Sequence, residues 1–158
     1  MIKPQVHYSE EVKTMTVTSD AFPERGYIPT KYTCDGENVN PPLMIHDLPH
    51  ETKSLAVIME DTDAPIRSWV HWMVWNIPPI EKIKESSAMG IEGLNDFRAL
   101  HYGGPCPPSG SHHYHYKVYA LNELLDLKEG ASKIELEKAM SLHVIGFGEL
   151  VGIYKRAM

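Results

Sequence analysis

Apolar and polar residues alternate in several segments of the chain, and this period of two predicts β-strands. Residues 14–19 (TMTVTS) carry β-branched side chains at this spacing, and residues 54–60 (SLAVIME) have the composition of a buried strand. Residues 69–77 (WVHWMVWNI) are apolar on both faces, which is typical of a central strand covered on each side. Residues 114–121 (YHYKVYAL) complete the strong strand signals.

The last third of the chain has the pattern of one short helix. Ser132 and Glu135 have the spacing of a capping box, in which the serine oxygen accepts from one free helix amide and the glutamate accepts from another. Apolar positions then recur every three or four residues, which predicts a helix with one face packed against the body. These positions are Leu136, Ala139, Met140 and His143.

Two glycines, Gly146 and Gly148, are expected to end this helix, and residues 149–154 (ELVGIY) to return as a last strand. Several strands with one clear helix predict a mainly β fold. We expect an antiparallel β-sandwich with one or two short peripheral helices, formed by residues 1–158 as a single domain.

The composition restricts the function. The chain has 15 Lys and Arg against 21 Asp and Glu, a net charge of −6, and no block of five basic residues, so no nucleic-acid partner is expected. Its longest aliphatic run, residues 55–59, is far shorter than a membrane span of about 20 residues. The first 15 residues lack the apolar core of a signal peptide. We therefore expect a cytoplasmic protein without integral membrane association.

Cys34 and Cys106 are the two cysteines of the chain. One pair does not make a disulfide framework, and a cytosolic protein would keep both reduced. Free thiols are therefore the expectation, and the sequence leaves a single bridge open.

Residues 61–65 (DTDAP) connect two predicted strands, where Asp and Pro are ordinary turn residues. His71 follows six residues beyond Pro65, and strand alternation places it on one face with Trp69, Met73 and Trp75. A buried imidazole needs a hydrogen-bond partner or a ligand, since an unpaired buried polar group costs about 1 to 3 kcal/mol. A core histidine with a protein partner is the simplest interpretation of His71.

A second group of candidate residues begins in the segment 102–110 (YGGPCPPSG). Its glycines let backbone amides approach a ligand closely, and its prolines stiffen the loop, as suits the mouth of a site. Alternation along the next strand places His112 and Tyr114 on the inner face, and His113 and His115 on the outer, more water-compatible face.

Together these motifs resemble the phosphatidylethanolamine-binding protein family. The motifs are D-x-D-A-P with a histidine six residues beyond it, Y-x-G-x-x-P-P-x-G, and His-x-Tyr at residues 112–114. Further agreement at residues 32–37, 40–43, 52–55 and 149–152 extends the resemblance over roughly residues 14–156. Within the family the chain is most similar to the bacterial and archaeal branch described as Raf kinase inhibitor-like.

The resemblance implies a β-sandwich with a small pocket for phosphate-like anions, such as a phosphorylethanolamine or phospholipid head group. Carried over residue by residue, the pocket residues are Asp61, Pro65, His71, Gly104, Pro108, His112 and Tyr114. The resemblance also implies a non-enzymatic protein without catalytic residues, metal or cofactor, which inhibits or regulates a kinase or protease client. Relatives occur as monomers or dimers, so a homodimer is left open.

Two positions depart from the family pattern. His113 stands where the family usually has Arg, so a shift of one residue would nominate His113 and His115 instead of His112 and Tyr114. The alternation of faces favours His112 and Tyr114. Cys106 occupies a position that is Gly in the eukaryotic branch, which leaves the amide geometry of the loop to be determined.

An acidic protein can still hold an anion in such a pocket. A neutral imidazole, with a pKa near about 6.5, offers an N–H donor, while a phosphate monoester loses its second proton near about pH 6. Each group can therefore stabilise the charged form of the other. Asp61 is expected to orient one imidazole and to favour its protonated form.

Two enzyme classes remain as alternatives. Two histidines and a carboxylate could hold a transition metal, although no H-E-x-x-H or C-x-x-C pair is present. Ser109 or Ser111 beside His112 could serve a hydrolase, but the chain has no G-x-S-x-G elbow.

Overall fold

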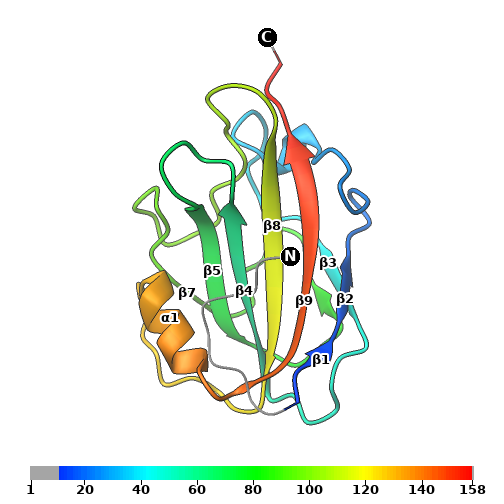
Figure 1. Cartoon of the computed structure of the whole chain (residues 1–158), viewed down its shortest axis with the longest axis vertical. Coiled ribbons are helices and arrows are strands. Elements are labelled where there is room, and N and C mark those ends of the chain that lie inside the picture. The colour runs from blue at the N-terminus through cyan, green and yellow to red at the C-terminus, as the bar shows by residue number, and fades with distance from the viewer. Residues whose placement is uncertain (1–10, 158) are drawn as a thin grey trace.

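The computed structural model describes residues 11–157, which form two packed β-sheets and one short α-helix (Figure 1). One sheet has the strand order β1-β9-β8-β4-β5-β7 and the other the order β2-β3-β6. The strands are β1 (Lys13–Thr14), β2 (Thr16–Thr18), β3 (Leu43–His46), β4 (Ser54–Asp61), β5 (Trp69–Ile77), β6 (Lys82–Ile83), β7 (Ile91–Glu92), β8 (His112–Leu121) and β9 (Val144–Tyr154). Within both sheets only β1 and β9 pair in parallel. The predicted antiparallel β-sandwich is confirmed.

The central strand β4 is buried along its whole length because both of its faces are covered. Leu55, Val57 and Met59 lie in the core between the two sheets. Ala56 and Ile58 face the opposite way, into a second core beneath the helix α1 (Lys133–Met140). This arrangement explains why the segment is apolar at successive positions instead of alternating.

The helix begins as the sequence predicts. Ser132 is the N-cap: its side chain accepts from the Glu135 amide at 3.2 Å, and Glu135 Oε1 accepts from the Ser132 amide at 2.9 Å. Leu136 and Met140 are fully buried against the outer face of the six-stranded sheet. Besides this helix, the described chain has a 3₁₀ turn at Thr30–Tyr32, labelled η1.

The predicted end of the helix is wrong. The helix ends at Met140, so His143 lies outside it, and Leu142 makes the turn with a φ of 71°. Gly146 and Gly148 lie inside β9, whose first residue is Val144. Their lack of a Cβ serves packing: at Gly148 a Cβ would collide with the Met15 carbonyl of the adjacent segment.

The first predicted strand is present but divided between the two sheets. Residues 13–14 pair with β9, whereas residues 16–18 pair with β3 of the smaller sheet. Met15 lies at the crossing, where its amide donates to Phe147 O at 2.9 Å and its side chain is buried. Alternation predicts the extended backbone but carries no information on this change of sheet.

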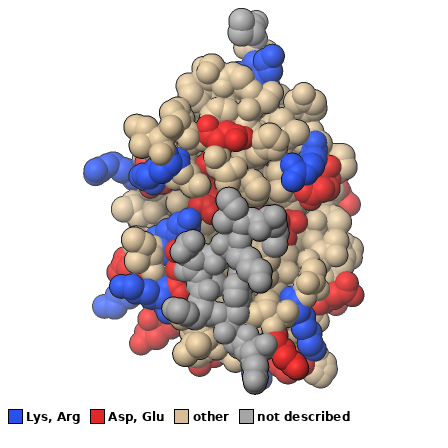
Figure 2. All heavy atoms as spheres, in the orientation of Figure 1, with Lys and Arg blue, Asp and Glu red and all other residues tan. Residues whose placement is uncertain are grey.

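Residues 1–10, which carry most of the segment considered for a signal peptide, lie outside the described residues. None of the helices described between residues 11 and 157 has the length and hydropathy needed to cross a membrane. On the face drawn in Figure 2, basic and acidic side chains are interspersed over the visible surface.

A buried ion-pair cluster joins the helix to the sheet. Glu60 on β4 accepts from Lys117 on β8 and from Lys133, the first residue of α1, each at 2.7 Å. The Glu60 side chain is only 3% exposed. Burial opposes its ionisation, but the two lysines outweigh this effect and lower the pKa of Glu60.

We expect Glu60→Gln to lower the unfolding free energy by about 3 kcal/mol at pH 7, because it leaves two poorly solvated ammonium groups without a counter-charge. Urea unfolding monitored by circular dichroism measures the change. Glu37→Gln is the matched control, since Glu37 forms a more exposed pair with Lys31 at 3.6 Å and should have a much smaller effect. Equal effects of the two substitutions would contradict a structural role for the Glu60 cluster.

Candidate functional site

The candidate site lies at the end of the six-stranded sheet where β4 ends, β5 and β8 begin, and the C-terminal residues emerge (Figure 1). His71 reaches it because β5 contains a bulge. Glu60 pairs with Val70 and Met59 with Trp72, so His71 is the extra residue between these two pairs. A bulge redirects the strand and its side chains, and bulges are frequent beside functional sites.

The bulge overturns one prediction from alternation. Met73 and Trp75 lie in the core beneath α1, but Trp72 lies in the core between the sheets. The His71 ring packs at 5.3 Å, edge to face, against Tyr114 of this inter-sheet core. His71 therefore does not share a face with Met73 and Trp75, because one inserted residue resets the period of two.

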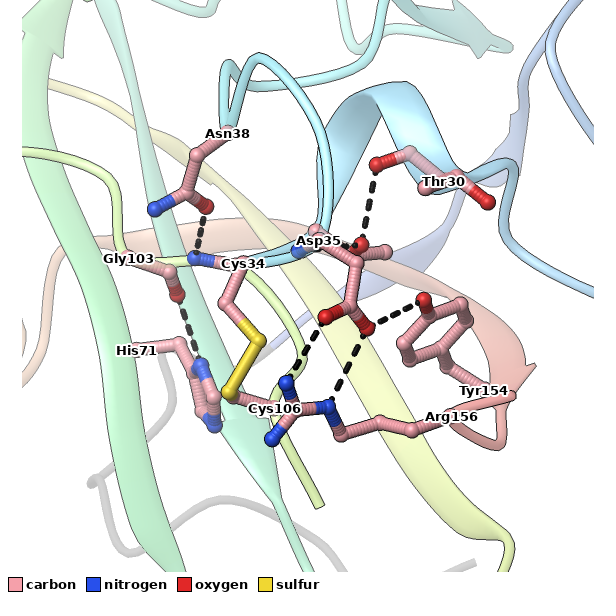
Figure 3. The surroundings of a disulfide bond; sticks show 11 residues. Thr30, Cys34, Asp35, Asn38, His71, Gly103, Cys106, Tyr154 and Arg156 are labelled. Atoms are coloured by element: carbon pink, nitrogen blue, oxygen red, sulfur yellow. Dashed lines mark hydrogen bonds and ion pairs between the residues drawn. A yellow bond between two sulfur atoms is a disulfide. The ribbon is translucent and has the colours of Figure 1, made fainter. Parts of the chain in front are cut away.

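The ring of His71 is fixed by backbone contacts. Its Nδ1 donates to the carbonyl of Gly103 at 2.6 Å (Figure 3). Its own carbonyl accepts from the Gly103 amide and from Asn95 Nδ2, both at 3.1 Å. Burial lowers the pKa of His71, so the free imidazole is neutral near pH 7.

His112 is held by Asp61 across the neighbouring strands β4 and β8. His112 Nδ1 donates to Asp61 Oδ2 at 2.6 Å, and Asp61 Oδ1 accepts from the Asp63 amide at 2.8 Å. Both carboxylate oxygens thus have a donor. Asp61 is 4% and His112 7% exposed, so the pair is nearly closed from solvent.

Tyr114 lies between the two imidazoles. Its ring stacks on His112 at 6.4 Å between centroids and meets His71 at 5.3 Å. Its hydroxyl is fully buried and finds no hydrogen-bond partner in the part of the chain that the structure describes. Burial and the nearby Asp61 charge raise the pKa of Tyr114, so the hydroxyl keeps its proton; the backbone amide of Cys106 offsets part of this effect.

The hydrogen bonds define which ring atoms are left for a ligand. A carbonyl or a carboxylate only accepts, so both His71 and His112 carry their proton on Nδ1. In the neutral state each Nε2 is consequently an acceptor. The expectation that a neutral imidazole donates to an anion is wrong for this geometry, because each such donor is already used within the protein.

The other predicted site residues lie on the surrounding loops. Gly104 is buried, but its amide already donates to Asn38 Oδ1 at 2.7 Å, so it offers no free donor (Figure 3). The backbone amide of Cys106, which is near Tyr114, is the remaining candidate donor of this loop. Pro65 and Pro108 are exposed, on the loops that follow Asp61 and precede His112.

The two histidines of the alternative register lie on the outer face of β8. His113 is half-exposed, and its Nδ1 bonds Asp63 Oδ2 at 2.7 Å. His115 contacts Glu149 Oε2 at 3.3 Å and Thr62 Oγ1 at 3.1 Å. Only the register with His112 and Tyr114 brings imidazoles together around one buried hydroxyl.

The expectation of free thiols is wrong. Cys34 and Cys106 form a disulfide, with their Cα atoms 5.5 Å apart despite a separation of 72 residues (Figure 3). The long connection after β2 folds over the loop that precedes β8, where the Cys34 amide donates to Pro105 O at 3.1 Å. This contact between two loops has no signature in strand or helix periodicity.

Two hollows border the site. One of about 240 Å³ is lined by both cysteines, Phe97 and the Gly103–Gly104 backbone. The other, of about 230 Å³, lies between residues 107–110 and the C-terminal residues 155–157. His71 and His112 line neither, and they are only 3% and 7% exposed. The two rings are therefore nearly closed from solvent in this structure.

Sequence reasoning did not identify Asn38, Asn95 and Phe97. Asn95 is 3% exposed and bonds the carbonyls of His71 and His101 as well as the amides of Phe97 and Ala99. Phe97 packs against the His71 ring at 5.0 Å. All three residues come from irregular segments, and an Asn in a loop is ordinarily a turn residue.

The residues named for the two enzyme alternatives can also be located in the structure. Ser109 and Ser111 are exposed on the loop. Between residues 11 and 157, no group of three or more His, Cys, Asp and Glu side chains is arranged to hold a metal ion.

The chain is similar to a known protein family and to several proteins of known sequence. A family model described as phosphatidylethanolamine-binding protein matches residues 18–155. A UPF0098 protein of Pyrococcus horikoshii is 49% identical over 157 residues, covering 92% of this chain and 79% of that protein. A UPF0098 protein of Methanothermobacter thermautotrophicus is 46% identical over 150 residues, covering 90% and 99%.

Two solved structures are also similar. A phosphatidylethanolamine-binding protein homologue from Chlamydia trachomatis has a TM-score of 0.87 at 39% identity, covering 92% of this chain and 99% of that one. Escherichia coli YbcL, described as a member of the mammalian family, has a TM-score of 0.83 at 30% identity, covering 90% and 99%.

The burial of His71 predicts a pH-dependent stability. Its folded pKa lies below the unfolded value of about 6.5, so the unfolded chain binds the proton more readily and stability falls as pH drops through that region. His71→Asn keeps a donor toward Gly103 O but does not titrate. In phosphate-free buffer, urea unfolding from pH 7.5 to 5 should show wild type losing stability relative to this variant. Parallel curves would contradict a neutral, buried His71.

Proposed function

This chain belongs to the phosphatidylethanolamine-binding protein family, and we propose that it is a non-enzymatic binding protein whose His71–Tyr114–His112 cluster binds a phosphate-like anion. Membership of the family supports a binding function. The anion and the residues that bind it are those that the resemblance implies, and the geometry of the site supports them.

The observation that carries the proposal is the buried hydroxyl of Tyr114, which has no hydrogen-bond partner of normal geometry among residues 11–157. Leaving such a group without a partner costs about 1 to 3 kcal/mol, so an apolar ring would be the more stable choice for a purely structural position. The Tyr114 ring packs against two imidazoles that are each anchored through Nδ1. A ligand oxygen bound here would accept from this hydroxyl and use both Nε2 atoms.

The tautomers determine what kind of oxygen fits. A ligand at either Nε2 must share a proton with it, because neutral Nε2 is an acceptor. Phosphate monoesters satisfy this requirement in two equivalent ways: a monoanion brings a P–OH group, or a dianion accepts from an imidazolium. Asp61 holds His112 through Nδ1 at 2.6 Å, so Nε2 is the ring atom left for such an anion. Phosphate and phosphorylethanolamine are therefore the appropriate probes.

Tyr114→Phe tests the role of the hydroxyl directly. Calorimetric titration with phosphorylethanolamine should show affinity weakened about tenfold or more, because a hydrogen bond to a charged group is lost. Unfolding free energy should change by no more than about 1 kcal/mol, because the hydroxyl has no hydrogen bond of normal geometry to the described residues that could be lost.

The two measurements together distinguish a ligand group from a structural one. Tyr102→Phe is the control, because the Tyr102 hydroxyl donates to Tyr32 O at 2.8 Å and its removal should lower stability. A Tyr114→Phe variant that loses stability and keeps its affinity would overturn the proposal.

Binding of inorganic phosphate should tighten as pH falls from about 8 to about 6, because a proton must lie between the anion and an Nε2 atom. Calorimetry in buffers of different ionisation enthalpy should show net proton uptake near pH 8. His112→Ala should abolish this uptake and most of the affinity, whereas His113→Ala, on the outer face, should retain both. Affinity that is constant or rises with pH, or a loss confined to His113→Ala, would contradict the assignment.

Four finer expectations stay predictions: a phospholipid head group as ligand, a kinase or protease as client, a homodimer, and a cytoplasmic location. Phosphorylethanolamine and inorganic phosphate, titrated side by side, would separate recognition of the head group from recognition of the anion alone.

A further inference from the structure

The disulfide joins the two segments that build the rim of the candidate site. Cys34 lies in the connection between β2 and β3, and Cys106 lies in the loop between β7 and β8. Both residues are partly exposed, so a thiol reductant can reach the bridge in the folded protein. Figure 3 shows the bridge beside the His71 ring and its contact with Gly103.

The two ends of the bridge are not equally anchored. On the Cys34 side, the adjacent Asp35 accepts from Tyr154 Oη at 2.7 Å and from Arg156 Nη2 at 2.8 Å (Figure 3). Hydrogen bonds from Arg156 and Tyr154 lower the pKa of Asp35, so this pairing persists at neutral pH. The Cys34 segment therefore stays attached to the end of β9 whether or not the bridge is present.

The Cys106 side is anchored mainly before the bridge. Gly103 bonds His71 through its amide at 3.1 Å and through its carbonyl at 2.6 Å. Residues 105–111, which follow, belong to no strand or helix, and Pro105 O accepts from the Cys34 amide at 3.1 Å. The bridge adds a covalent link at Cys106. Breaking it removes this restraint from the loop, while Asp35 still holds the segment around Cys34.

This loop places two groups at the site. Gly103 O orients the His71 ring, and the backbone amide of Cys106 is near enough to Tyr114 to oppose the rise in its pKa. Pro108, Ser109 and Gly110 lie beyond the bridge and are exposed, so they can move aside for a ligand in either redox state. The bridge therefore fixes the residues that orient the site and leaves the outer part of the rim free.

We infer that the Cys34–Cys106 disulfide is a redox-sensitive clasp, and that its reduction by a dithiol weakens binding of phosphate-like anions at the cluster. The inference rests on the proposed function. In the reaction a dithiol attacks the bridge, forms a mixed disulfide and closes to its own cyclic disulfide. The dithiol gives up two electrons and two protons, and Cys34 and Cys106 become thiols.

The experiment compares phosphate affinity in the two redox states of the full chain. Protein is titrated calorimetrically with inorganic phosphate before and after treatment with dithiothreitol, and thiols are counted by alkylation and mass spectrometry. Reduction should proceed without loss of the circular dichroism signal and should raise the Kd for phosphate about tenfold, the expected result of losing preorganised donors. Unchanged or tighter binding after reduction, or reduction only upon unfolding, would overturn the inference.

Two variants separate the clasp from general stability. The double variant Cys34→Ser, Cys106→Ser should bind like the reduced protein and ignore dithiothreitol. Ser132→Ala removes the cap of α1, which Figure 1 shows on the flank of the sandwich, away from the edge where β5 and β8 begin, and should lower stability while keeping the phosphate affinity. If Ser132→Ala loses as much phosphate affinity as the cysteine variant, the weaker binding results from lower stability, and the clasp is contradicted.

Failure of the proposed function would be recognised separately. If the oxidised protein does not bind phosphate, the proposed anion site is contradicted. The inferred control of anion binding by the disulfide is then contradicted as well. Amide hydrogen exchange then tests the mechanical part alone. Faster exchange at Gly103 and Gly104 on reduction, with β4 unchanged, would show that the bridge holds the loop; equal exchange in both states would overturn this part as well.

Discussion

Both buried imidazoles of this protein are held through Nδ1, one by a carbonyl and one by a carboxylate. The remaining chemistry of the site depends on this constraint. In the neutral form of each ring it makes Nε2 an acceptor, and it leaves the buried Tyr114 hydroxyl as a side-chain donor of the cluster. A net charge of −6 is therefore compatible with the proposed anion site, because recognition there would depend on a shared proton and local dipoles rather than on lysines or arginines.

The elements that periodicity can report were predictable from the sequence. β4, β5, β8 and the capping box of α1 appear where alternation and spacing place them, because each is governed by neighbours close in the chain or by burial of whole faces. Three features depend on distant contacts. The bulge at His71, the change of sheet at Met15 and the Cys34–Cys106 bridge each need a partner that local pattern does not contain.

The candidate residues divide in the same way. Asp61, His71, His112 and Tyr114 were nominated by motif, and the fold brings all four together. Asn95 and Asn38, which fix the backbone around them, come from loops that have no periodic pattern. Gly104 was nominated for its free amide, yet that amide is already bonded to Asn38. Side-chain support of this kind becomes visible only when the loops are seen in three dimensions.

The division of the first strand affects how the sandwich is closed to other molecules. β1 borders β9 and β2 borders β3, so one short stretch of chain covers part of an edge of each sheet. Unpaired edges are templates on which further polypeptide can add by main-chain pairing. Residues 13–18 thus shield part of both sheets from edge-to-edge self-association. A chain shortened beyond them would expose unpaired strand edges on both sheets.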